Sequence, residues 1–261
     1  MNASDLKIDM NSDLGEGFGA WSVGSDKDVL RSVSSANIAC GYHAGDPSIM
    51  RKTVKMCADS GVAVGAHVSY PDLVGFGRRK MECTPQEVYD YCVYQIGALA
   101  AFCKTQGVRI QHVKPHGALY NQAAKDRALA DAVASAAADM TCDIILMGLA
   151  GSEFEPAAKA AGVKFAAEAF ADRAYLKDGS LCPRSREGAV IHDAKIAAAR
   201  VVRMVTQGTV TACDGTTIRF RPDTICLHGD TKEAVEMASA VRAALEAAGV
   251  KIVPLYDCSV A

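Results

Sequence analysis

The chain has 261 residues, 50% of them hydrophobic, and a formal net charge of −2. This length can bury a large core, as one large domain or two small ones, and the lack of a basic excess disfavours nucleic acid as a partner. The first ten residues lack the apolar centre of a secretory signal, and no apolar run reaches the roughly 18 residues of a membrane span. The 10 cysteines are scattered singly, which is typical of reduced, mostly buried thiols in a cytoplasmic protein.

Short apolar runs alternate with longer helical ones along the chain. The predicted strands cover residues 8–13, 36–41, 62–67, 109–114, 143–148, 164–168, 224–228 and 251–255. The predicted helices lie near residues 26–34, 47–60, 84–106, 126–139, 151–162, 192–207 and 231–248. This repeated strand–helix order indicates an α/β protein with a parallel sheet, and about eight strands favour a closed barrel over an open sheet.

Two segments interrupt the strand–helix order. Residues 172–191 are polar and loop-like, and residues 209–220 carry β-branched side chains around Asp214-Gly215, which predicts a hairpin. The chain shows no linker, low-complexity stretch or internal repeat. We therefore expect a single domain over residues 1–261.

Polar and ionisable side chains recur at the ends of the predicted strands. Residues two apart on a strand share a face, so Asp9, Asn11 and Asp13 lie together on the first strand. The second, third, fourth and seventh strands end in the same way, with His43, His67, Lys114 and His116, and His228. Ligands of parallel α/β folds bind at the carboxyl ends of the strands, so this pattern predicts a shared site there.

Glycines lie next to two groups of candidate site residues, His43 and the pair Arg78-Arg79. His43 lies between Gly41 and Gly45, which permit a sharp turn beneath a ligand. Arg78 and Arg79 follow a glycine pair after the third strand, where they are either simply solvated or bind an anion. The sequence has no P-loop, HExxH or GxSxG motif, and its glycine-rich residues 15–19 have the wrong spacing for a dinucleotide site.

Six segments together closely resemble the LamB/YcsF family, the A component of the prokaryotic ATP-dependent 5-oxoprolinase. They are IDMNSDLGEGFGAW (8–21), SSANIACGYHAGDP (34–47), VGAHVSYPDLVGFGRR (64–79), HVKPHGALYNQA (112–123), FADRAYLKDGSLCPRS (170–185) and TICLHGD (224–230). The resemblance implies a distorted (β/α)7-8 TIM-like barrel of the glycoside hydrolase/deacetylase type, in agreement with the strand pattern.

The resemblance also implies an activity and its partners. The family opens the lactam ring of 5-oxo-L-proline to L-glutamate, with hydrolysis of ATP to ADP and phosphate, in a complex with B and C subunits. ATP is then a cosubstrate. A divalent metal is compatible with this chemistry, and it would be magnesium bound to ATP. The sequence leaves open whether the chain also forms a homo-oligomer. Phosphorylation of the amide oxygen would create a leaving group and an electrophilic carbon for water.

Such chemistry requires an acid or base, cationic stabilisation of phosphate or oxyanion, and an anchor for the substrate carboxylate. The predicted catalytic residues are Asp13, His43, His67, Lys114 and His116. The predicted substrate-binding residues are Asn11, Glu16, Arg78, Arg79, Arg173, Arg184 and His228. We expect Asp13 to activate water, and Lys114 and His116 to stabilise negative charge and protonate the departing nitrogen.

Two alternatives remain open from the sequence. In a metal-dependent amidohydrolase or deacetylase of the same barrel superfamily, Asp13, His43 and His67 would bind a divalent cation. In a non-catalytic substrate-binding or regulatory subunit, no cluster of titratable groups would be needed, and this chain has one.

Overall fold

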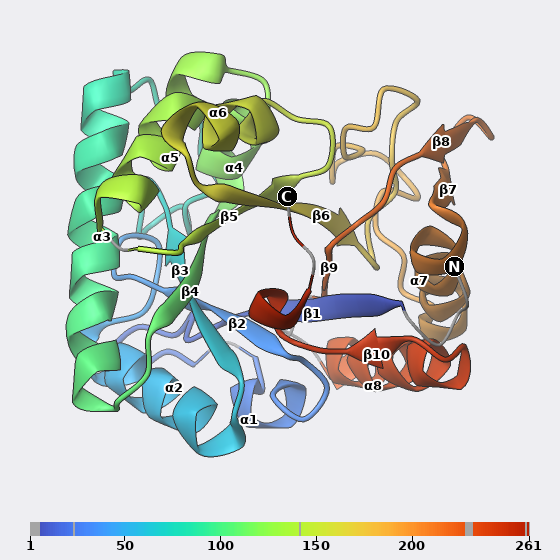
Figure 1. The fold of residues 1–261 in the computed structure, drawn as a ribbon, viewed down its shortest axis with the longest axis horizontal. Helices are drawn as coiled ribbons and strands as arrows, with labels where there is room; N and C mark the ends of the chain where they lie inside the picture. The colour runs from blue at the N-terminus through green and yellow to red at the C-terminus, as the bar shows by residue number, and fades with distance from the viewer. Residues whose placement is uncertain (1–5, 23, 141, 228–231, 259, 261) are drawn as a thin grey trace.

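The computed structural model describes residues 6–22, 24–140, 142–227, 232–258 and 260 (Figure 1). Seven parallel strands form a closed ring in the order β1, β2, β3, β4, β5, β6 and β9, and β9 pairs again with β1. Their bounds are β1 Lys7–Leu14, β2 Ser35–Ala39, β3 Ala63–Val68, β4 Ile110–Pro115, β5 Ile145–Leu149, β6 Lys164–Phe170 and β9 Thr224–Cys226. The predicted closed α/β barrel is confirmed.

The eighth predicted strand lies outside this ring. β10 (Lys251–Ile252) pairs with the start of β1, at Lys7 and Ile8. It is followed by a 3-10 turn, η2 (Leu255–Asp257). Leu255 of this turn packs inside the barrel against Ile145, Met147 and Ala166.

Helices surround the ring of strands (Figure 1). Their bounds are α2 Pro47–Ser60, α3 Pro85–Thr105, α4 Gly117–Ala123, α5 Arg127–Met140, α6 Phe154–Ala161, α7 Ala194–Gln207 and α8 Lys232–Ala247. The start of α3 follows the predicted signals, since Thr84 and Glu87 form a reciprocal capping box ahead of Pro85. Within the described residues, no helix has both the length and the apolar character needed to cross a membrane.

Two helical segments differ from the prediction. The helix expected near 26–34 is only a single turn, α1 (Asp26–Val29), because Ser34 is already bonded to β1 through the Met10 carbonyl. The short helix α4 was not predicted and begins directly after His116. The residues of α4 therefore follow directly on the carboxyl end of β4.

The two predicted interruptions have the expected forms. Residues 172–191 contain no regular helix or strand, although Arg173 bridges Val190 and Tyr175 bridges Leu181. β7 (Thr209–Thr211) and β8 (Thr217–Arg219) form the predicted antiparallel hairpin. All ten cysteines lie in the described part of the chain, where they are free and mostly buried, as predicted.

Candidate active site at the carboxyl ends of the strands

A cavity of about 470 Å³ opens where the barrel strands end. Its lining includes Asp13 from the end of β1, His67 from β3, and Lys114 and His116 from β4 and the residue after it. Glu16 follows β1 and lines the same cavity. The structure therefore brings together most of the residues predicted to be catalytic. Cavities of this size are typical of small-molecule sites.

His43 is carried by a tight turn after β2. Gly41 and Gly45 have φ values of 96° and 81°, which side chains other than glycine rarely adopt. A Cβ at Gly45 would also collide with the backbone of Ala39. The turn leaves the His43 side chain fully buried beside Glu16, behind the cavity wall.

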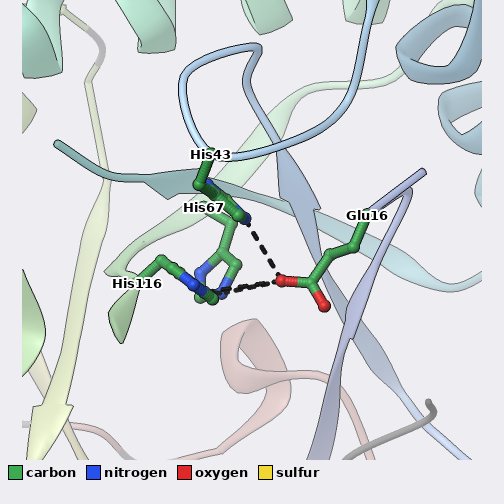
Figure 2. A group of neighbouring side chains, drawn as sticks. All are labelled: Glu16, His43, His67 and His116. Carbon is green, nitrogen blue, oxygen red and sulfur yellow. Dashed lines mark hydrogen bonds and ion pairs between the residues drawn. The ribbon is translucent and has the colours of Figure 1, made fainter. Parts of the chain in front are cut away.

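Glu16 gathers three histidines around its carboxylate (Figure 2). Its Oε1 atom lies 3.2 Å from His43 Nε2, 3.4 Å from His116 Nδ1 and 4.0 Å from His67 Nε2. The His67 and His116 nitrogens are 3.0 Å apart, and one ligand atom from each of the four residues lies within 4.8 Å of the others. Glu16 was predicted to bind substrate, and its place among the histidines was not foreseen.

Burial controls the charge of these imidazoles. Desolvation, followed by the neighbouring His67, lowers the pKa of His43 well below its ordinary value. Desolvation, with His43 and His67 nearby, does the same for the pKa of His116. The two rings stack in parallel with centroids 3.8 Å apart. Both imidazoles are therefore neutral at neutral pH.

Lys114 stands between two carboxylates inside the barrel. Its Nζ atom lies 3.0 Å from Asp13 Oδ1 and 2.8 Å from Glu168 Oε1, and only 2% of the residue is exposed. Burial lowers the pKa of Lys114, but Asp13, Cys226 and Glu168 outweigh it and raise that pKa well above the usual value. Lys114 is therefore a fixed positive charge at the bottom of the cavity.

Glu168 and Tyr120 belong to this arrangement and were not predicted. Tyr120 donates its hydroxyl hydrogen to Glu168 Oε2 at 2.7 Å, and Asn11 Nδ2 donates to Glu168 Oε1 at 3.2 Å. A signal was available, because Glu168 is the one charged residue in the middle of an alanine-rich strand, KFAAEAF. A buried carboxylate on such a strand requires partners of this kind.

A layer of amides lies beneath the cavity. Asn37 Nδ2 donates to Asn11 Oδ1 at 2.7 Å and to Asp13 Oδ1 at 2.8 Å, while Asn37 Oδ1 accepts from His112 Nε2 at 2.6 Å. Asn11 is fully buried and does not belong to the cavity lining. Asn11 instead bonds Lys114 and Glu168, so it positions these two side chains, and its predicted contact with substrate stays a prediction.

The four candidate arginines divide into two kinds. Arg78, Arg173 and Arg184 line the cavity. Arg79 instead forms an ion pair with Asp72, and 66% of its side chain is exposed. Because Asp72 engages the guanidinium of Arg79, Arg78 is the better placed of the two for the predicted anion anchor, and the role of Arg79 stays a prediction. The other predicted substrate residue, His228, lies outside the described residues.

Comparison with known proteins identifies the family. Residues 8–260 match the family model described as the LamB/YcsF family. The chain belongs to this family.

Relatives of this LamB/YcsF chain cover nearly its whole length. A protein of Bacillus licheniformis, named as the A component of 5-oxoprolinase, is 53% identical over 94% of this chain and 97% of its own length. A Pyrococcus abyssi protein of the same name is 52% identical over 97% of this chain and 99% of its own. The crystal structure of a lactam utilization protein from Thermus thermophilus superposes with a TM-score of 0.91, at 48% identity, and the match covers 95% of this chain and 99% of that one.

In this LamB/YcsF barrel, one group of four side chains fits a metal ion better than the predicted ligands Asp13, His43 and His67 do. The group with mutually close ligand atoms is Glu16, His43, His67 and His116. Asp13, predicted as a ligand, stands next to that group, with Oδ2 3.2 Å from His67 Nε2 and Oδ1 bonded to Lys114. Three imidazole nitrogens and one carboxylate suit a divalent transition metal, whereas Mg²⁺ prefers oxygen ligands and water.

Proposed function

We propose that this chain is the A component of an ATP-dependent 5-oxoprolinase, which opens 5-oxo-L-proline to L-glutamate and hydrolyses ATP to ADP and phosphate together with B and C subunits. Relatives with that name share more than half of their residues with this chain over almost the full length, which supports the proposal. The free thiols support a cytoplasmic location. The observation that carries the proposal is one cavity that combines carboxylates, a buried lysine and arginines.

This combination matches the chemical groups of the substrate. 5-Oxoproline carries one carboxylate and one lactam amide, so its binding requires a cationic anchor and groups that act on an amide. Arg78 and Arg184 line the cavity and offer guanidinium groups that bind a carboxylate or a phosphate in bidentate fashion. ATP phosphate groups require cations of the same kind.

Asp13 is placed to act as the base that activates water. Its Oδ1 atom is held by Asn37 and Lys114, and the residue lines the cavity. Two fixed hydrogen bonds orient the carboxylate before substrate binds, which is the preorganisation that general-base catalysis requires.

Lys114 and His116 have narrower roles than the sequence predicts. The Nζ atom of Lys114 is engaged by Asp13, Glu168 and Asn11, so Lys114 serves as a fixed cation that stabilises negative charge. The Nε2 atom of His116 donates to the Phe76 carbonyl at 2.9 Å. Only Nδ1 is therefore left for proton transfer to the departing nitrogen, and in the neutral ring Nδ1 must first take up that proton.

A second candidate is a metal-dependent amide hydrolase that works without ATP. The group of Glu16, His43, His67 and His116 favours it. A dication held by these four residues would supply Lewis-acid polarisation of a carbonyl or phosphoryl oxygen in the cavity. Asp13 would orient water and the arginines would bind the anion in this case too, whereas His116 Nδ1 would bind the metal and would not transfer a proton.

One assay separates the two candidates. Glutamate and phosphate release from 5-oxoproline are measured with the chain alone and with its B and C partners, each with and without ATP. The proposal expects glutamate release from the assembled complex only when ATP is present, with phosphate released alongside. Glutamate release by the chain alone without ATP favours the second candidate. A fully assembled complex that releases no glutamate with ATP overturns the 5-oxoprolinase assignment.

A further inference from the structure

We propose that Glu16, His43, His67 and His116 bind one divalent transition-metal ion, and that zinc is the ion this donor set fits best. The four side chains come from separate loops and strand ends and meet at one point (Figure 2). Glu16, His67 and His116 line the cavity, and His43 is not part of its lining. The proposal of a metal site is argued from the geometry of these four side chains and not from the proposed reaction. It therefore holds or fails independently of the reaction proposed above.

The distances between donor atoms match those of a small tetrahedral site. Zinc–nitrogen bonds of about 2.0–2.1 Å place the corners of a tetrahedron about 3.3 Å apart. The observed separations are 3.2 Å for Glu16–His43, 3.4 Å for Glu16–His116 and 3.0 Å for His67–His116. The separation between Glu16 Oε1 and His67 Nε2 is larger, at 4.0 Å. Shifts of a few tenths of an ångström on most edges would bring the four atoms onto one ion.

The hydrogen bonds of two rings fix which nitrogens face the group. His67 Nδ1 lies 3.0 Å from the Lys114 carbonyl, and His116 Nε2 lies 2.9 Å from the Phe76 carbonyl. A carbonyl oxygen only accepts, so each of these nitrogens carries the hydrogen. His67 Nε2 and His116 Nδ1 are therefore the nitrogens that face the group and are available to a metal ion. Zinc-binding histidines are commonly oriented by such a bond from the other nitrogen.

The result is a set of possible metal-ligand atoms that face one another. His67 Nε2 and His116 Nδ1 are 3.0 Å apart, and Asp13 Oδ2 lies 3.2 Å from His67 Nε2. Glu16 adds a carboxylate oxygen within 3.4 Å of His116. The three histidines are at most 6% exposed, so bulk water does not separate these atoms. A divalent cation placed among these nitrogen and carboxylate oxygen atoms would be attracted to all of them, and their burial strengthens that attraction.

The surrounding backbone is shaped to hold the histidines in place. Phe76 has a φ of 54°, an uncommon conformation for a bulky residue, and its ring packs edge-on against His43 and His116. A Cβ at Gly77 would come within 2.9 Å of both histidine side chains. Strained residues that persist in this way cluster at functional sites. Phe76 and Gly77 therefore form a support that orients two of the four ligands.

Metal binding is tested on the full-length chain after chelator treatment. Zinc and cobalt are titrated into the stripped protein, and bound metal is counted per chain. We expect one ion per chain with submicromolar affinity, and a cobalt spectrum of tetrahedral type without a thiolate charge-transfer band. The last feature excludes adventitious binding to the exposed Cys142 and Cys213. A stripped chain that binds neither metal more tightly than the micromolar range overturns the proposal, and a proton shared between His67 and His116 then explains their contact.

Substitutions locate the ion. Glu16→Gln and His67→Asn should each weaken zinc binding by more than about a hundredfold, beyond the cost of losing a group that only orients a ligand. His192→Asn is the matched control, because His192 is exposed and outside the group, and it should leave the affinity unchanged. Glu16 is partly exposed and its replacement keeps its shape, so Glu16→Gln decides the matter if His67→Asn does not fold. Zinc affinity unchanged in Glu16→Gln, or lost in His192→Asn, contradicts the site.

Discussion

The interior of the barrel has two parts of opposite chemistry. β1 to β4 point polar and ionisable side chains inward, among them Asp9, Asn37 and His112, all fully buried. β5 consists of apolar residues and glycine, and its Ile145 and Met147 pack with Leu255 of η2. The polar part leads to the cavity and the apolar part closes the other end of the ring.

The comparison shows how a barrel tolerates so many buried polar groups. Each of the amides and carboxylates described above has a partner on a neighbouring strand, as in the chain from His112 through Asn37 and Asn11 to Glu168. Paired groups of this kind cost little and fix one arrangement of side chains. Stability then has to come from apolar packing. We expect substitutions in the polar part to affect catalysis and those in the apolar part to affect folding.

The largest effect is expected for Asp13→Asn. The amide keeps the size of the side chain but loses the charge and basicity, so turnover should fall by about 10²–10⁴ in the assembled complex. Lys114 keeps Glu168 as a partner, so the loss of unfolding free energy should stay below the about 3–5 kcal/mol of a buried charge left alone. Turnover is measured as glutamate release and stability by urea unfolding.

Asp59→Asn is the control for this substitution. Asp59 is exposed on α2 and pairs with Lys55 one turn away, so its replacement should change neither turnover nor stability appreciably. An Asp13→Asn complex with near-normal turnover would move the base elsewhere, and Glu16, in the same cavity, is the next residue to test.

Leu255→Ala should have the opposite profile. Leu255 is fully buried against Ile145, Met147 and Ala166 at the end of the barrel away from the cavity. Truncating a buried leucine usually costs about 2–5 kcal/mol of unfolding free energy, and the cavity left behind is part of that cost. Turnover of the folded protein should be retained. A large fall in turnover at a temperature where the variant is fully folded would contradict the division between the two parts.

The sequence predicts the polar part well because its signal is local. Alternation along a strand is enough to align Asp9, Asn11 and Asp13, and the parallel order of strands puts His67 and His116 at the same edge. The closed ring and the hairpin follow from similarly local patterns.

What the sequence could not predict depends on contacts between distant loops. Nothing in the adjacent pair Arg78-Arg79 shows which guanidinium faces the cavity, since that is decided by the ion pair of Arg79 with Asp72. The gathering of Glu16 with three histidines depends on the paths of separate loops. The packing of Leu255 inside the barrel likewise requires the closed ring to exist first.

Asp9 gives the polar part an unusual pH dependence. Burial raises the pKa of Asp9 to about 6, although hydrogen bonds from Ser34, Ser35 and Thr224 oppose that rise. The folded state then binds the proton more tightly than the unfolded state, so protonation of Asp9 stabilises the fold as the pH falls from 7 towards 4. The difference from the ordinary value of 3.8 corresponds to about 3 kcal/mol.

The measurement compares wild type with Asp9→Asn by urea unfolding between pH 7 and pH 4. The unfolding free energy of the wild type should rise relative to that of the variant as the pH falls. Asp214→Asn is a control of opposite sign, because hydrogen bonds from Thr216 lower the pKa of the exposed Asp214. Its small stabilising effect is lost, not gained, as the pH falls. A pH-independent difference between wild type and Asp9→Asn would show that Asp9 is not perturbed.

The smallest effect compares the neighbours Arg78 and Arg79. Arg78 lines the cavity, whereas Arg79 is exposed and paired with Asp72. Lysine keeps the charge but cannot bind a carboxylate with two parallel hydrogen bonds. Arg78→Lys should therefore weaken the apparent affinity for 5-oxoproline by about tenfold, equivalent to about 1.4 kcal/mol. Arg79→Lys preserves an exposed ion pair and should stay within about threefold of wild type. Initial rates of glutamate release across substrate concentrations give both values. Equal effects at the two positions, or a larger one at Arg79, would mean that the 72–79 loop acts through its shape and that Arg78 does not anchor the anion.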